Sequence, residues 1–152
     1  MKNNSKPRSP EEVNRLISAE LPNPDEEPEL YAIVSKMMTH RPCGDVNPRA
    51  PCMRDGNCTK RFPKTFRDTT NIEVNGYPEY RRRDNRRCVH YGQQVLDNRH
   101  VVPYNPKLSL LLRAHINVEI CALIEAVKYL FKYVYKGHDR AALRLSQIYA
   151  RQ

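Results

Sequence analysis

Residues 115–137, HINVEICALIEAVKYLFKYVYKG, change their hydrophobic period part-way along. Polar and apolar residues alternate over 115–120, which is the period of a β-strand. Over 122–136 the apolar residues recur every three or four positions, as in an amphipathic helix, and Gly137 follows as a stop signal. A strand that runs directly into a helix predicts an α+β fold.

The two faces of these elements carry different chemistry. Alternation in the strand places His115, Asn117 and Glu119 together on the polar face. On the helix, Tyr129 and Tyr133 are i, i+4 neighbours on the side opposite the apolar stripe. Tyrosine is amphipathic and common at the boundary of a core, which is the simplest interpretation of this pair.

A second interpretation of the tyrosine pair is nucleophilic catalysis. A phenol oxygen can attack a DNA phosphodiester and form a covalent link to the strand, provided that a metal or a base activates it. Lys132 or Lys136, on the same face of the helix, could stabilise the developing charge. Spacing alone does not separate this interpretation from the first.

Upstream, turn and cap signals divide the chain. Ser9 and Pro10 predict a helix start, and Pro28 predicts a second helix with a core-facing stripe from Leu30 to Met38. Asn75-Gly76 predicts the turn of a β-hairpin over 70–83. We expect a disordered tail at 1–8, a polar loop at 84–99, a short strand at 101–102 and chain breaks at Pro103 and Pro106, within a single domain over 9–152.

A cysteine- and histidine-containing loop spans residues 40–58. Its pattern is H-x2-C-x8-C-x5-C, formed by His40, Cys43, Cys52 and Cys58. Four nitrogen and sulfur ligands suit a tetrahedral structural zinc, with no position left open for catalysis. The alternative is three reduced thiols and a surface histidine, because the spacing matches no common zinc-finger formula.

Charge is distributed unevenly along the chain. Residues 11–30 hold seven acids and one base, a net of −6, which leaves +15 on the remainder of a chain whose total is +9. The positive charge is densest in one cluster, and such a cluster attracts nucleic-acid phosphates. The alternative is a solvated, solubilising loop. The candidate DNA-binding residues are Arg81, Arg82, Arg83, Arg86 and Arg87.

Composition limits the class of protein. The 152 residues suffice for one modest core, and no stretch approaches the ~18 apolar residues of a membrane span. The N-terminal residues lack the apolar centre of a signal peptide, and the five cysteines are an odd number, so a disulfide framework is not expected.

Several segments together resemble the Helitron helicase-like N-terminal domain, the Rep part of rolling-circle transposases. The resemblance covers roughly residues 9–141. It is carried by SAELPNPDEEPELY (18–31), HRPCG (40–44), PCMRDGNCTKRFPK (51–64), GYPEYRRR (76–83), LDNRHVVPYNP (96–106), AHINVE (114–119) and KYLFKYVYKGHDRA (128–141).

The resemblance implies an HUH-type endonuclease that cleaves single-stranded DNA. Tyr129 and Tyr133 match the paired tyrosines of that family, and Lys136 matches the lysine after them. A divalent metal such as Mg or Mn, held by two histidines, would assist the attack. His115, Asn117 and Glu119 would be accessory ligands of that metal. The family also implies nuclear localisation and a covalently linked helicase domain.

Two departures from the family pattern qualify the expected activity. The five histidines include no H-x-H pair, which in the family lies upstream of residue 9, and no G-x-x-x-x-G-K-[ST] loop is present. We therefore expect a partial HUH-type Rep domain with a zinc-stabilised loop, a hairpin and a tyrosine helix. Its alternatives are a non-catalytic DNA-binding module and an inactive transposon remnant.

Overall fold

A computed structural model of the chain describes residues 9–72 and 78–120, which belong to one compact unit within residues 1–122. Several predictions lie outside the described residues. These are the tail at 1–8, the hairpin turn at 73–77, and the helix at 122–136 with Tyr129, Tyr133 and Lys136.

The first helix begins as its cap signal predicts. Helix α1 covers Pro10–Leu16, and the Ser9 side chain accepts a hydrogen bond from the backbone N–H of Glu12. Pro10 occupies the first turn, where its missing N–H costs no hydrogen bond. Val13 is fully buried and packs with Ile17, Ala19 and Tyr80 in a small apolar cluster.

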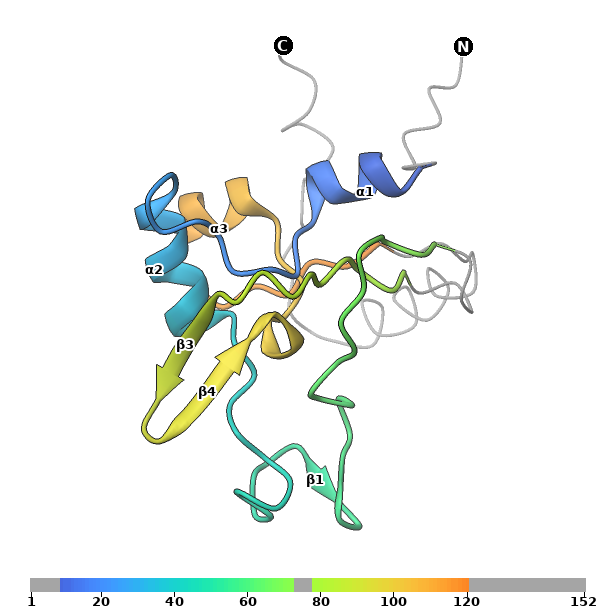
Figure 1. Ribbon diagram of the computed structural model, residues 1–152, viewed down its shortest axis with the longest axis vertical. Helices are drawn as coiled ribbons and strands as arrows, with labels where there is room; N and C mark the ends of the chain where they lie inside the picture. Colours follow the sequence, from blue (N-terminus) through green and yellow to red (C-terminus); the bar gives the residue numbers. More distant parts are fainter. Residues whose placement is uncertain (1–8, 73–77, 121–152) are drawn as a thin grey trace, which may run out of the picture. The chain divides into compact units, whose positions relative to one another are not determined.

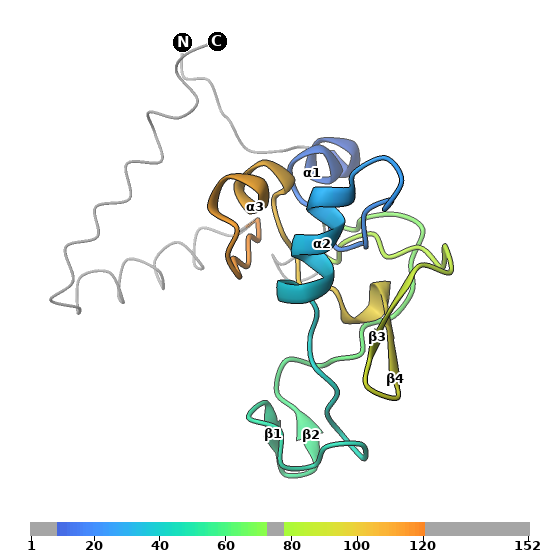
Figure 2. The same ribbon diagram turned by 90° about the vertical axis from the view of Figure 1, so that its left-hand side faces the viewer.

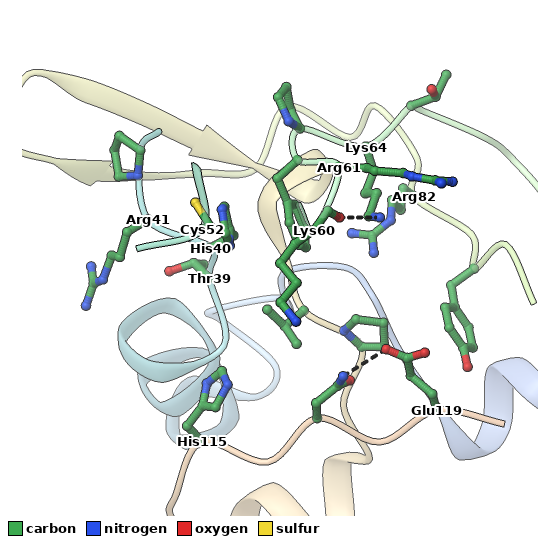
Figure 3. Close-up of a pocket in the computed structure, with 18 of the residues that line it drawn as sticks. Thr39, His40, Arg41, Cys52, Lys60, Arg61, Lys64, Arg82, His115 and Glu119 are labelled. Carbon is green, nitrogen blue, oxygen red and sulfur yellow. Dashed lines mark hydrogen bonds between the residues drawn. The ribbon is translucent and has the colours of Figure 1, made fainter. Parts of the chain in front are cut away.

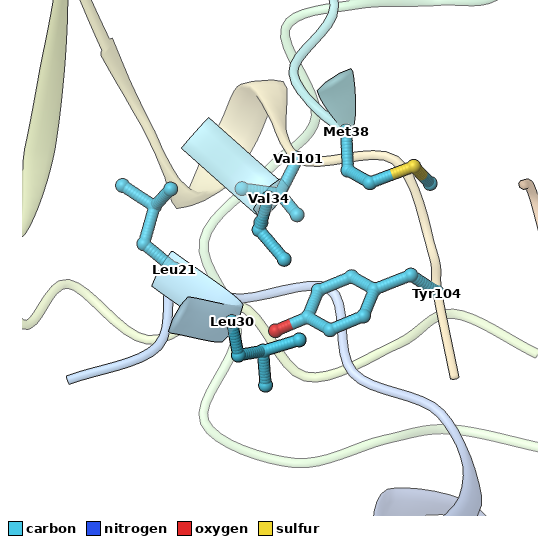
Figure 4. Close-up of a cluster of buried hydrophobic side chains, with 6 residues drawn as sticks. All are labelled: Leu21, Leu30, Val34, Met38, Val101 and Tyr104. Atoms are coloured by element: carbon cyan, nitrogen blue, oxygen red, sulfur yellow. The ribbon is translucent and has the colours of Figure 1, made fainter. Parts of the chain in front are cut away.

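The second helix supplies one wall of the main core. Helix α2 covers Pro28–Met37 and buries Leu30, Ile33 and Val34, so the predicted stripe is confirmed. The backbone N–H of Met38, the residue after the helix, donates to the carbonyl of Val34. Figure 4 shows the side chains that meet in this core: Leu21, Leu30, Val34, Met38, Val101 and Tyr104.

A third helix, α3, covers Pro106–Leu112, where the sequence analysis expected only a chain break. That expectation was wrong because Asn105 caps the helix, accepting a hydrogen bond from the N–H of Leu108, and Pro106 takes the first helical position. Helices α2 and α3 lie side by side (Figures 1 and 2), and an ion pair between Glu29 and Arg113 links their ends.

Residues 84–99 contain a hairpin rather than the expected polar loop. Strand β3, Cys88–Tyr91, pairs antiparallel with β4, Gln94–Asp97, and Val89 lies opposite Leu96. The short helix η1, Asn98–His100, follows directly. The sequence signal is weak because Leu96 is the one buried residue of the two strands.

A second, smaller hairpin lies within the cysteine-containing loop. Strands β1, Met53–Arg54, and β2, Asn57–Cys58, pair antiparallel, with Met53 opposite Cys58. Asp55 and Gly56 join them, and both have a positive φ, of 49° and 76°. A two-residue turn with both φ angles positive matches the twist of the flanking strands.

The predicted hairpin over 70–83 is present only as paired arms. Asn71 pairs with Glu79 and Arg67 pairs with Arg82 in isolated antiparallel bridges, and no continuous strand is assigned among the described residues of this segment. The expected strand at 101–102 is likewise a single bridge, between Thr39 and Val101.

Residues 115–120 are extended but form no strand, so that prediction was wrong in its pairing. Two backbone hydrogen bonds to other described residues anchor the segment: the N–H of Val118 donates to the carbonyl of Pro103, and the N–H of Ile120 donates to the Tyr80 hydroxyl. The predicted two faces are nevertheless present. Val118 and Ile120 pack against the cluster around Val13, whereas the three polar residues are exposed.

The described part of the chain is thus a small mixture of three α-helices and two two-stranded antiparallel sheets, in line with the expected mixed fold. None of its helices has the length and apolar character that crossing a bilayer requires.

Candidate metal centre and basic groove

Four side chains from the loop over 40–58 converge on one point, as the sequence predicts. The ligand atoms of His40, Cys43, Cys52 and Cys58 all lie within 4.8 Å of one another. The Sγ atoms of Cys43 and Cys58 are each 3.6 Å from Nε2 of His40. Ligand atoms around a tetrahedral zinc are roughly 3.5–3.8 Å apart, given bonds of about 2.0 Å to nitrogen and 2.3 Å to sulfur. The cluster could therefore hold a metal ion.

Backbone hydrogen bonds bring the four ligands together from separate turns. The N–H of His40 donates to the carbonyl of His100, which fixes the start of the loop against the core. The β1–β2 hairpin returns Cys58 to Cys52, and the N–H of Thr59 donates to the carbonyl of Cys52. Gly44, with a φ of 74°, makes the turn after Cys43.

The electrostatics of the cluster without a metal favour a lone pair at His40 but oppose the thiolate form at Cys43. Burial lowers the pKa of His40, and the charges of His100, Lys64 and Lys60 lower it further, so the imidazole keeps a lone pair for a metal. Burial, with hydrogen bonds to the other two cysteines, raises the pKa of Cys43 to about 12. Burial also opposes ionisation of Cys58, but backbone N–H groups of Phe62 and Lys60, together with hydrogen bonds to the other two cysteines, lower the pKa of that thiol.

The segment after the last ligand carries an aromatic contact to the cluster. The Phe62 ring stacks on the His40 imidazole, with centroids 4.3 Å apart and planes inclined by 10°. The Nζ atom of Lys64 lies over the same Phe62 ring, 5.0 Å from its centroid. The ligand His40 is therefore connected through one side chain to a cation outside the cluster.

That cation belongs to a groove with a cavity volume of about 1030 Å³. The groove adjoins the cluster, because His40 and Cys52 line it. Figure 3 shows Lys64 and Arg82 on one side of it and Glu119 on the other. The lining residues include two acids, Glu79 and Glu119. They also include seven cations: Lys36, Arg41, Lys60, Arg61, Lys64, Arg67 and Arg82.

The polar face of residues 115–120 lies along this groove. His115, Asn117 and Glu119 all line it. The His115 ring nitrogen Nδ1 is 2.6 Å from the carbonyl oxygen of Met37, and the Asn117 amide donates to Glu119 at 2.8 Å. Asn117 thus contacts Glu119, whereas His115 contacts the backbone of Met37. Within the described residues the His/Cys cluster alone brings three or more His, Cys, Asp or Glu ligand atoms together.

Most of the arginines predicted to bind DNA form hydrogen bonds or ion pairs within the protein. Arg82 is only 4% exposed, and its Nη1 donates to the carbonyls of Ala19, Asn98 and Val101. Burial lowers the pKa of Arg82 to about 10, so the guanidinium remains charged at neutral pH. This arginine holds three chain segments together, a role that charge counting could not reveal.

Arg81 and Arg83 instead face one carboxylate. Both form ion pairs with Glu20, at 3.5 and 2.7 Å, and the Glu20 side chain is only 8% exposed. Arg87 reaches the carbonyl of Leu21 at 3.4 Å, and Arg86 is exposed. The basic surface that the structure assembles therefore comes mainly from residues 60–67, which the sequence analysis did not single out. The run KRFPK at 60–64, in which three cations flank an aromatic ring, was the available signal.

No protein-family model matches the chain, and no curated protein is significantly similar to it. The functional assignment therefore rests on the geometry above and on the motifs of the sequence.

Proposed function

We propose that the chain is a zinc-stabilised, single-strand DNA-binding part of a Helitron-type Rep protein. The ordered motifs from SAELPNPDEEPELY to KYLFKYVYKGHDRA support the family assignment. The chemistry of one imidazole and three thiols supports zinc as the metal, because soft thiolates favour zinc over the hard cations Mg and Ca. Four protein ligands make its role structural.

The observation that carries DNA binding is the excess of cations along the groove beside the metal cluster. All seven cations line this groove, and their phosphate contacts would release counterions. Phe62 lines the same groove, but its ring is covered by the His40 imidazole and the Lys64 ammonium, so DNA binding rests on the cations. The preference for a single strand follows from the family resemblance.

In this proposal, strand cleavage requires an H-x-H pair that this chain lacks. Tyr129 and Tyr133 would attack the phosphodiester, and Lys136 would stabilise the developing charge. Mg or Mn would be held chiefly by an H-x-H pair from an upstream segment. A linked helicase domain and a nuclear location are proposed from the same family resemblance. His115 and Glu119 face the DNA groove and would be accessory to that metal only if their contacts rearranged.

The test is fluorescence anisotropy of zinc-loaded protein with single-stranded and duplex oligonucleotides at about 50 and 200 mM salt. We expect tighter binding to the single strand and a steep loss of affinity with salt. Lys60→Met should weaken binding, whereas Lys107→Met, an exposed lysine of α3 outside the groove, should not. Equal binding of Lys60→Met and the unaltered protein would remove the groove from the proposal.

A non-catalytic DNA-binding module is the second candidate, favoured by the lack of an H-x-H pair in this chain. The two candidates differ in one measurable product. Incubation with single-stranded DNA and Mn²⁺ should give a covalent tyrosine adduct only if the chain is catalytically complete. We expect no adduct from this chain, and loss of any adduct in Tyr129→Phe and Tyr133→Phe would identify the nucleophile.

A further inference from the structure

The groove contains a point where two cations lie close together beside the metal cluster. Lys64 is fixed at two atoms: its backbone N–H donates to the carbonyl of Arg99 at 2.9 Å, and its Nζ donates to the carbonyl of Lys60 at 2.8 Å. Figure 3 shows Lys64 and Arg82 close together, and Lys60 is an exposed lysine that lines the same groove. Two like charges at a half-buried place, with an exposed lysine beside them, call for an anion.

Arg82 is suited to face that anion. Its Nη1 donates to three backbone carbonyls, which holds the guanidinium in one orientation. The residue also lines the groove. A guanidinium held in this way binds an oxyanion with little loss of side-chain entropy.

No carboxylate forms an ion pair with these cations within the described residues. Burial lowers the pKa of Arg82 and of Lys64, and the charge of Glu119, on the opposite side of the groove, partly opposes that shift without forming an ion pair with either group. Glu119 therefore does not neutralise these cations by direct contact, and an incoming anion would face its carboxylate across the groove.

We propose that Lys60, Lys64 and Arg82 form a subsite for one phosphate group of the bound strand, and that the metal centre holds this subsite in place through Phe62. Phe62 stacks on the metal-ligand candidate His40 and lies under the Lys64 ammonium. A metal that fixes the imidazole therefore fixes the ring on which the lysine rests. This inference depends on the proposed function for the identity of the ligand, a nucleic-acid phosphodiester.

The experiment is lysine acetylation of the zinc-loaded full chain, followed residue by residue with mass spectrometry. The two probes are inorganic phosphate and an oligothymidylate of about 12 nucleotides, each compared with chloride at equal ionic strength. We expect both probes to slow acetylation of Lys60 and Lys64 several-fold and to leave that of Lys107 unchanged.

Two variants test the connection to the metal centre. Phe62→Leu should keep its zinc but lose most of the protection of Lys64, whereas Phe62→Tyr, which keeps the ring, should retain it. Phe66→Leu is the matched control, because Phe66 also lies under a cation, Arg99 at 4.7 Å, but does not line the groove. Zinc content and thermal unfolding show whether each variant is folded.

The outcomes separate the subsite from the proposed function. Protection by phosphate without oligothymidylate binding keeps the subsite and overturns DNA binding. Oligothymidylate binding, measured by anisotropy, without protection of Lys60 and Lys64 overturns the subsite alone. Failure of both probes overturns both ideas. Unchanged protection in zinc-loaded Phe62→Leu overturns the connection to the metal.

Discussion

The Phe62 ring lies parallel to the His40 imidazole, with centroids 4.3 Å apart and planes inclined by 10°. This contact joins the two parts of the candidate site. His40 belongs to the cluster that could hold a metal, and Phe62 belongs to the basic segment that lines the groove. Ordering of the loop by a metal and ordering of the groove are therefore expected to be a single event.

Removal of one metal ligand should abolish zinc binding. We expect about one zinc per chain in protein purified without chelator and little in Cys52→Ser. Cys88→Ser is the control, since Cys88 is a free cysteine in β3 that does not belong to the cluster. Elemental analysis by mass spectrometry measures the content. Retention of zinc by Cys52→Ser would contradict the assigned ligand set.

Substitution of the buried arginine should destabilise the fold strongly. Arg82→Met leaves the carbonyls of Ala19, Asn98 and Val101 without their donor. Loss of a buried charged partner typically costs about 3–5 kcal/mol. Arg86→Met, at an exposed position of the same predicted cluster, should change the free energy of unfolding by less than about 0.5 kcal/mol. Urea unfolding of zinc-loaded protein compares the two variants.

The ion pairs of Glu20 should make stability depend on pH. Burial opposes ionisation of this carboxyl, but the Arg83 side chain and N–H, with the charge of Arg81, lower its pKa below the usual 4.5. Since the folded pKa is the lower one, the stabilisation is complete above the unfolded pKa and is lost as the pH falls through the folded value.

Glu20→Gln isolates that contribution. At neutral pH the variant should lose about 1.5–3 kcal/mol, the usual worth of hydrogen bonds to a charged group, and less if solvent around the exposed Arg83 screens the pair. The difference in free energy of unfolding between the variant and the unaltered protein should become smaller below the pKa of Glu20 in the unfolded chain. Urea unfolding over this pH range measures the gap, which cancels any common effect of acid on the metal centre. A constant gap would contradict the role of the charge.

The cap of α3 should contribute to stability through two contacts. The side-chain oxygen Oδ1 of Asn105 accepts a hydrogen bond from the backbone N–H of Leu108. Its side-chain Nδ2 donates to the backbone carbonyl of Leu16 at 2.7 Å. Asn105→Ala should cost about 1–2 kcal/mol, more than Ser9→Ala, whose single capping bond lies at an exposed helix end. Thermal unfolding compares the two, and the reverse order would show that the bond to Leu16 adds nothing.

Local chemistry made some features predictable from the sequence. Ser9 and Pro10 defined the start of α1 because capping depends on neighbouring residues alone. The four clustered side chains of the loop could be predicted because few side-chain types bind zinc, so their grouping carries information even at unusual spacing. The two faces of residues 115–120 followed from alternation, which an extended chain preserves without a paired strand.

Other features depend on contacts between distant segments. Arg82 sits in a charged run, yet one of its partners, Ala19, lies 63 residues away, and only the fold brings them together. Pro106 was interpreted as a break because proline ends a helix as readily as it begins one, and the cap at Asn105 decides between the two. The β3–β4 hairpin could not be predicted because its two strands bury so little apolar surface.

X-ray absorption spectroscopy at the zinc edge tests the central claim most directly. We predict four ligands, one nitrogen at about 2.0 Å and three sulfurs at about 2.3 Å, in protein that also binds single-stranded DNA. A spectrum dominated by nitrogen and oxygen neighbours, or a metal-free protein that binds DNA equally well, would contradict a groove built on a zinc centre of His40, Cys43, Cys52 and Cys58.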